Sequence, residues 1–155
     1  MEILETGMIN EIIIDSLKKG MSYSDYRNLV SDLVEKRSTT GHEKTEALAN
    51  YTQLNDRRMK RWDKTVKVSE AIKNKIKNFN KKVTLLVISE SWCGDAAHIM
   101  PVINKVAALN ANIDYKVVLR DENDALMSQF LTNGGKSIPK LIMIDSETNE
   151  VLNTF

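Results

Sequence analysis

Cys93 is the side chain of this 155-residue chain best suited to covalent chemistry, and it is the only cysteine. A β-branched apolar run at residues 83–88 ends shortly before it, and apolar residues recur at helical spacing over residues 99–109 after it. This order predicts that Cys93 lies in a turn between a buried strand and a helix. Free backbone N–H groups and the helix dipole favour an anion there, so the thiol can ionise to a nucleophilic thiolate.

The residues beside Cys93 limit this chemistry. The carboxylate of Asp95 suits a helix start, but a nearby negative charge raises the pKa of a thiol. A chain with one cysteine forms no internal disulfide and has no second thiol to release a mixed disulfide. Two interpretations of Cys93 therefore stay open: a reactive monothiol that exchanges with glutathione or a partner protein, or a weakly reactive cysteine retained in an inherited turn.

Two neighbouring side chains also carry two interpretations each. Trp92 either covers the thiol or a substrate face, or it is a half-buried packing residue. His98 lies about one turn into the helix and is either a general base or a surface residue. Because Cys93, Asp95 and His98 lack a recognised zinc spacing, we favour a surface histidine and predict no metal site.

The elements that must position Cys93 alternate between strand and helix in the second half of the chain. Apolar, β-branched or edge-like segments predict strands at residues 83–88, 113–119, 141–144 and 151–155. Helices are expected over residues 99–109 and 123–133, the second ended by Gly134 and Gly135. This order implies a parallel pair of strands joined by a helical crossover.

The first 80 residues predict helices instead. Apolar residues recur at helical spacing in four stretches, at residues 9–17, 26–34, 48–62 and 68–79. Gly20 ends the first helix, Ser22 caps the second, and residues 38–41 form a loop. We expect a helical segment at residues 1–80 that packs on a core at residues 81–155 as one composite domain, because no flexible linker separates them.

Composition is that of a soluble globular protein, with 42% hydrophobic residues, 28% charged residues and a net charge of +1. No apolar run approaches the roughly 18 residues of a membrane span. The N-terminus also lacks the basic and apolar regions of a secretion signal. We therefore expect no membrane partner and, by default, a cytoplasmic location, while no feature sets an oligomeric state.

Positive charge gathers between Arg57 and Lys82, where eleven lysines and arginines stand against two acids. No aromatic stacking pattern or nucleic-acid motif accompanies this charge. We therefore favour a solvated helix face paired with acids elsewhere over binding of nucleic acid or another acidic macromolecule. Lys136 and Lys140 are likewise either solvated loop lysines or groups that attract an anionic substrate such as glutathione.

Trp92, Cys93 and Gly94 resemble, in type and order, the Trp-Cys-Gly-Pro-Cys motif of the thioredoxin family. Ile138 and Pro139, placed before a strand, are similar to the cis-proline loop of that family. The resemblance implies an α/β, thioredoxin-like fold, a mixed sheet with helices on both faces. It also implies a cis peptide at Pro139 that faces Cys93 and presents backbone groups to thiol or peptide substrates.

The resemblance covers roughly residues 82–155, with departures from the family pattern. Ala96 stands where the family has its resolving cysteine, and Asp95 where it has proline. In the thioredoxin family a buried acid before the motif assists proton transfer. Val87 falls at the position of that acid, so we expect this assistance to be absent. The helix that usually closes the fold has no counterpart before Phe155. Two interpretations stay open: the sequence is truncated at this end, or the N-terminal helices take over the packing of that helix.

A narrower group of bacterial thioredoxin-like proteins is also similar, through residues 92–97, 119–123 and 134–140. The expected function is monothiol thiol–disulfide exchange through Cys93 in cell redox homeostasis. The partners would be protein or small-molecule thiols and disulfides, without a resident cofactor. Glutathione or another low-molecular-weight thiol would resolve the adduct. The alternative is a non-catalytic module that binds a peptide or protein. The expected substrate-binding residues are Trp92, Gly94, Asp95, Ile138 and Pro139.

Overall fold

A computed structural model describes residues 2–155, with side-chain burial from residue 7 onward. The elements follow in this order: α1 (Glu2–Lys19), α2 (Tyr23–Glu35), α3 (Glu46–Thr65), α4 (Glu70–Lys77), β1 (Val83–Ser89), α5 (Gly94–Ala108), β2 (Ile113–Leu119), the 3-10 helix η1 (Arg120–Glu122), α6 (Asp124–Gln129), β3 (Lys140–Asp145) and β4 (Val151–Thr154). Within residues 2–155, no helix is both long and apolar enough to cross a membrane.

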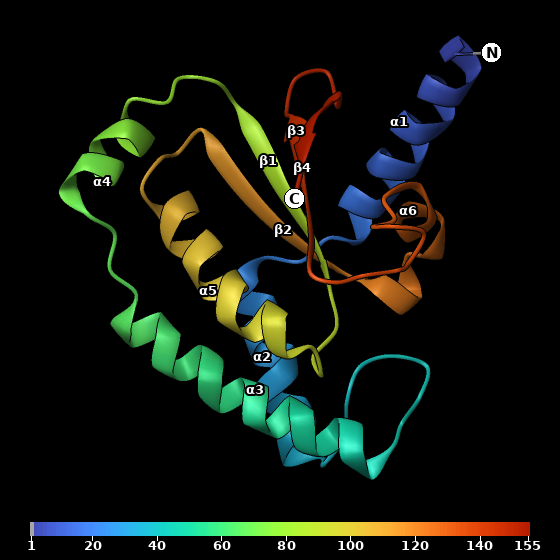
Figure 1. The fold of residues 1–155 in the computed structure, drawn as a ribbon, viewed down its shortest axis with the longest axis vertical. Coiled ribbons are helices and arrows are strands. Elements are labelled where there is room, and N and C mark those ends of the chain that lie inside the picture. Colours follow the sequence, from blue (N-terminus) through green and yellow to red (C-terminus); the bar gives the residue numbers. More distant parts are fainter. Residues whose placement is uncertain (1) are drawn as a thin grey trace.

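The strands form one mixed sheet in the order β2-β1-β3-β4 (Figure 1). β1 runs parallel to β2, with Val83 opposite Ile113, and antiparallel to β3, which pairs antiparallel with β4. A parallel pair needs a crossover connection, and α5 supplies it. The predicted α/β class is therefore confirmed, and the end of the central strand β1 leads directly into the turn that holds Cys93.

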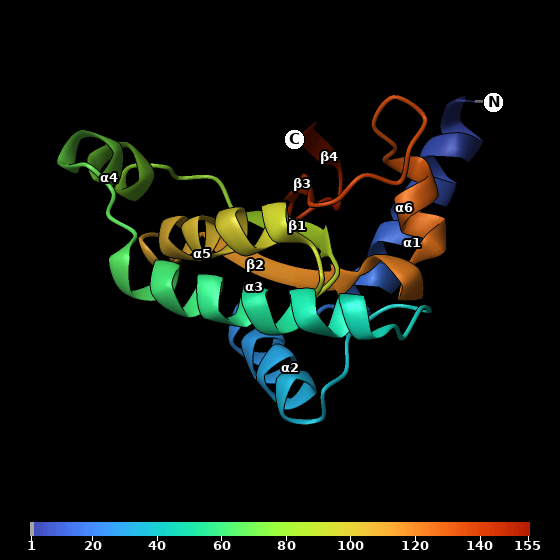
Figure 2. The same ribbon diagram turned by 60° about the horizontal axis from the view of Figure 1, so that its bottom comes forward.

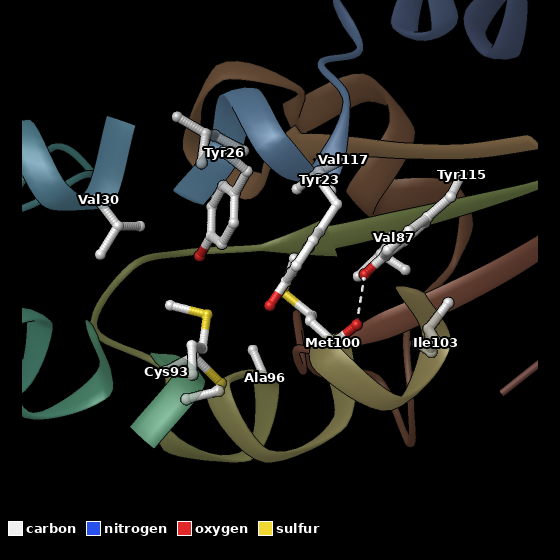
Figure 3. Packing of buried hydrophobic residues seen from close by; sticks show 13 residues of the cluster. Tyr23, Tyr26, Val30, Val87, Cys93, Ala96, Met100, Ile103, Tyr115 and Val117 are labelled. Carbon is white, nitrogen blue, oxygen red and sulfur yellow. Dashed lines mark hydrogen bonds between the residues drawn. The ribbon is translucent and has the colours of Figure 1, made fainter. Parts of the chain in front are cut away.

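Side chains alternate along β1 between two apolar layers. Val87 points toward α2 and α5, into a layer that includes Tyr26 and Met100 (Figure 3). Leu86 and Ile88 point to the opposite face, which α1 and α6 cover. α3 packs on α2 and α5 rather than on the sheet (Figure 2). Helices thus cover both faces of the sheet, as predicted.

Local sequence signals begin and end the N-terminal helices. Gly20 ends α1, and Ser22 caps α2 by accepting from the backbone N–H of Asp25, as predicted. Thr45 caps α3 in the same way. Met21, between the first two helices, exchanges backbone hydrogen bonds with Val117 at the outer edge of β2. These signals bring α2 and α3 to the face of the sheet on which α5 lies.

The helix predicted at residues 123–133 is wrong in its extent, because α6 has only six residues. Thr132 and Gly135 exchange backbone hydrogen bonds of 3.0 Å across a tight turn. The two central residues of that turn, Asn133 and Gly134, both have positive φ. Asn-Gly in that conformation is the preferred two-residue turn of a β-hairpin, so the chain leaves the helix before it.

Candidate functional site

Cys93 lies where β1 gives way to α5, and it occupies the N-cap position of that helix. Its backbone N–H donates to the carbonyl oxygen of Glu90 at 3.1 Å, and its own carbonyl accepts from Ala97 at 3.2 Å. The thiol makes no capping hydrogen bond. We call residues 90–94 the thiol turn. It places Sγ beside the free N–H groups of the first turn of α5.

Ile138 and Pro139 approach the thiol from the loop that leads into β3. The peptide bond between them is cis. The thiol of Cys93 donates to the carbonyl oxygen of Ile138, with 3.5 Å between Sγ and that oxygen. Ile138 also packs against both apolar layers. The thiol, the start of α5 and this loop therefore meet at one place.

Burial dominates the chemistry of the thiol. Cys93 is only 8% exposed, and Figure 3 shows it with Ala96 on the first turn of α5, opposite Tyr26 of α2. Burial raises its pKa most, and the Asp95 carboxylate adds to the rise. Backbone N–H groups of α5 and the guanidinium of Arg120 lower the pKa without reversing the change. At neutral pH the thiol is therefore less ionised than that of a free cysteine.

A buried carboxylate lies three residues before Cys93. Glu90 is fully buried, and its side chain accepts hydrogen bonds from the hydroxyl of Thr40 and, at 2.9 Å, from the backbone N–H of Asp121. Burial raises its pKa, and these two hydrogen bonds oppose that rise. The family position for a buried acid is the apolar Val87, as expected, but the sequence analysis missed Glu90. Its burial has no sequence signal, because an acid directly after an apolar strand usually marks the solvent-exposed end of that strand.

Polar side chains from the N-terminal half hold the thiol turn in place. The Ser91 hydroxyl lies within hydrogen-bond distance of the hydroxyls of Thr39 and Thr52. The backbone N–H of Ser91 donates to the Thr40 hydroxyl at 2.8 Å, and the Asn55 amide donates to the Ser91 carbonyl oxygen at 3.0 Å. These side chains are buried. The loop before α3, and α3 itself, are therefore part of the site.

Two arginines that the sequence analysis did not connect to the site flank the thiol turn. The guanidinium carbon of Arg120 lies 5.1 Å from the ring centroid of Trp92, which is half-buried. Nη1 of Arg58 lies 3.2 Å from the position that a Cβ on Gly94 would occupy. Any larger residue at position 94 would therefore displace Arg58. Asp95, next along the chain, is exposed.

The remaining candidate residues lie outside the thiol turn. His98 is exposed on α5, and its Nδ1 accepts from Nε1 of Trp62 at 2.9 Å. Across the part of the chain that the structure describes, no group of three or more His, Cys, Asp or Glu side chains is placed to hold a metal ion. Lys136 pairs with Asp124 of α6, and Lys140 donates to a threonine hydroxyl after α6 at 3.2 Å.

Comparisons with known proteins agree with this fold. A family model described as Thioredoxin matches residues 41–155. The crystal structure of a protein of unknown function from Pseudomonas aeruginosa is similar, with 17% identity and a TM-score of 0.58 over 69% of this chain and 68% of that one. An HIV epitope scaffold has 18% identity and a TM-score of 0.57 over 87% of this chain and 76% of its own. At these identities the two structures show the fold alone. No curated protein matches the sequence.

Proposed function

Because this chain belongs to the thioredoxin family, we propose that it performs thiol–disulfide exchange through a single cysteine, Cys93. The observation that carries the proposal is the position of Sγ, at the start of α5 and 3.5 Å from the Ile138 carbonyl oxygen. A disulfide substrate along the loop at Ile138 and Pro139 would present its sulfur to the thiolate. Trp92 and Gly94 would line the approach to the thiol, with Asp95 at its exposed rim.

The proposed reaction has two steps. Cys93 gives its proton to solvent, and the thiolate attacks one sulfur of a disulfide. A new S–S bond to Cys93 forms as the old one breaks, and the other half of the substrate leaves as a thiolate. An external thiol such as glutathione, itself ionised, then attacks the mixed disulfide and releases Cys93. The second thiol must come from outside because Ala96 occupies the place where an internal one would stand.

A turnover assay tests this proposal. With glutathione supplied, the protein should catalytically cleave a mixed disulfide between glutathione and a peptide, and Cys93→Ser should abolish the activity. Insulin reduction by the native chain should be slow, and Ala96→Cys should accelerate it because an internal thiol then resolves the adduct. Fast insulin reduction by the native chain would contradict the need for an external thiol. No turnover by a folded protein would contradict the proposal itself.

One observation favours a second candidate, a non-catalytic module that binds an extended peptide between Trp92 and Pro139. Cys93 is almost fully buried and its pKa is raised, so the sulfur is hard to reach and a smaller fraction of it is thiolate at neutral pH. The two candidates differ in their dependence on the sulfur. A binding module would keep its peptide affinity in Cys93→Ser and form no mixed disulfide, whereas the exchange reaction requires that disulfide.

A further inference from the structure

Exposed apolar side chains gather where the outer surfaces of α3 and α5 meet (Figure 2). Trp62 of α3 lies edge to face against His98 of α5, with 6.1 Å between the ring centroids. Val102 follows His98 by one turn and Ile99 precedes Val102 by one turn, so these three are neighbours on α5. Trp62, Ile99 and Val102 are 38%, 48% and 37% exposed. We call these four residues the α3–α5 patch.

A cavity of about 400 Å³ opens within this patch, between the two helices. It is lined by Arg58, Arg61, Trp62, Thr65 and His98. The surface that it presents is almost entirely apolar, so the two arginines line it with their aliphatic stems. The cavity is therefore suited to a bulky apolar side chain, such as leucine or phenylalanine, from a molecule that covers the patch.

Positive charge borders the patch on its α3 side. The acids Asp56 and Asp63 of α3 both pair with Arg27 of α2, at 2.9 Å and 3.2 Å, so they are turned toward that helix. Among residues 7–155, four cations of α3 have no carboxylate within ion-pair distance: Arg57, Arg58, Arg61 and Lys64. This departs from the expectation that acids elsewhere would pair with the basic run. The unpaired cations are complementary to an acidic partner.

Charge and apolar surface together favour one kind of partner over two others. A second copy that pairs through the same patch would bring like charges together. A nucleic acid would engage the arginines through its phosphates, but Ile99, Val102 and the apolar cavity would add little to that contact. An acidic amphipathic helix uses both features, because its apolar face covers the patch while carboxylates on its flank meet the cations.

We propose that the α3–α5 patch binds an acidic amphipathic helix of a partner protein. One bulky apolar side chain of that helix enters the cavity beside Trp62, and others cover Ile99 and Val102. Its carboxylates pair with Arg61 and Lys64. The helix lies away from Asp95, an exposed acid one turn before Ile99. This inference goes beyond the proposed exchange, because the contact does not involve the sulfur.

The test measures the binding of synthetic peptides by fluorescence anisotropy. The probe is a labelled peptide of about 15 residues, enough for a helix, with leucines along one helical face and glutamates on the other. Two control peptides change one property each, with glutamine in place of glutamate or serine in place of leucine. Each control should bind at least about tenfold more weakly than the probe. The affinity of the probe should also fall as salt is added.

Two matched pairs of variants locate the binding surface. Val102→Glu places a carboxylate within the patch and should weaken the probe at least about tenfold, because it repels the glutamates and opposes the leucines. Leu131→Glu places the same charge on an exposed leucine after α6 and should leave the affinity within about twofold. Arg61→Gln should weaken binding about two- to fivefold, and Lys19→Gln, at the end of α1, should not. Cys93→Ser should bind like the native protein.

Several results would overturn this inference and leave the proposed exchange intact. They are no binding of the probe, equal binding of the glutamate and glutamine peptides, and a folded Val102→Glu variant that binds like the native protein. Single-stranded DNA that binds more tightly than the probe, and loses affinity in Arg61→Gln, would assign the surface to nucleic acid instead. If Val102→Glu does not fold, the peptide comparison with the native protein still decides. Loss of exchange with intact peptide binding would contradict only the proposed function.

Discussion

Cys93 is surrounded by groups with opposite effects on its ionisation. Burial and the Asp95 carboxylate raise its pKa, and the first backbone N–H groups of α5 lower it by less. A thiolate of higher pKa is the better nucleophile but is present in a smaller fraction at neutral pH. Its reaction rate should therefore rise with pH through the neutral range. In the proposed exchange, a bound substrate that brings its sulfur to Cys93 would compensate for the small thiolate fraction.

Glu90 allows a prediction about stability and pH. Its pKa is raised in the folded protein by burial, so its contribution to stability is full below the ordinary carboxyl pKa and is lost as pH rises through the raised value. Glu90→Gln does not titrate, and its amide can still bond Thr40 and the backbone of Asp121. Urea denaturation should therefore show Glu90→Gln gaining stability relative to the native protein between about pH 4 and pH 7.

Glu90→Ala is the contrasting variant. It leaves the Thr40 hydroxyl and the Asp121 N–H without their buried acceptor, and should cost roughly 2 kcal/mol or more at both pH values. A difference between Glu90→Gln and the native protein that stays constant with pH would show that Glu90 does not titrate in this range. The buried carboxylate would then have no part in the pH dependence of folding.

At the scale of elements, the loop between α2 and α3 packs closely against the thiol turn. Gly41 has a φ of +94°, and a Cβ there would lie 3.0 Å from a carboxylate oxygen of Asp121 and 3.4 Å from Nε1 of Trp92. Glycine is needed at this position both for its backbone conformation and for this close approach. The loop thus fixes the side of the turn that carries Trp92.

Gly41→Ala should destabilise the protein more than Gly134→Ala, a matched control. Gly134 also has a positive φ, but a Cβ there meets nothing within 4 Å. Replacing Gly134 by alanine should therefore cost only the strain of a side chain at positive φ, about 1 kcal/mol of stability. Gly41→Ala adds the close contacts of the new Cβ with Asp121 and Trp92, and should cost about 2 to 3 kcal/mol. Chemical denaturation measures both values. Equal losses would mean that the loop yields easily and does not constrain Trp92.

Elements with a strong local signal could be predicted from the sequence. The strand at residues 83–88, the helix after Cys93 and the caps at Gly20 and Ser22 depend on residues close in the chain, and the structure has them at those positions. α6 could not be bounded in the same way, because its apolar spacing continues past the helix. The Asn133–Gly134 turn, a signal of hairpins, excludes a helix that continues to residue 133, but α6 already ends at Gln129.

At the scale of the whole molecule, the N-terminal helices supply much of the site. Thr40 bonds to Glu90 across fifty residues of sequence, and Arg58 reaches Gly94 because α3 packs on α5 (Figure 2). No local pattern encodes such contacts. Arg58 stands in a basic run that is equally typical of a solvated helix face, so only the packed fold distinguishes it from Arg57. The motif at Cys93 could be predicted, but its surroundings could not.

The proposed exchange depends most directly on whether the folded protein presents Cys93 as an ionisable, reactive thiol. The measurement is the alkylation rate of Cys93 by iodoacetamide between pH 6 and pH 10, for the native protein and Asp95→Asn, with circular dichroism to monitor folding. We expect one titration with a midpoint above about 8.5, the ordinary cysteine value, and a lower midpoint in Asp95→Asn. No alkylation of the folded protein at any pH, or a midpoint well below the ordinary value, would contradict the account.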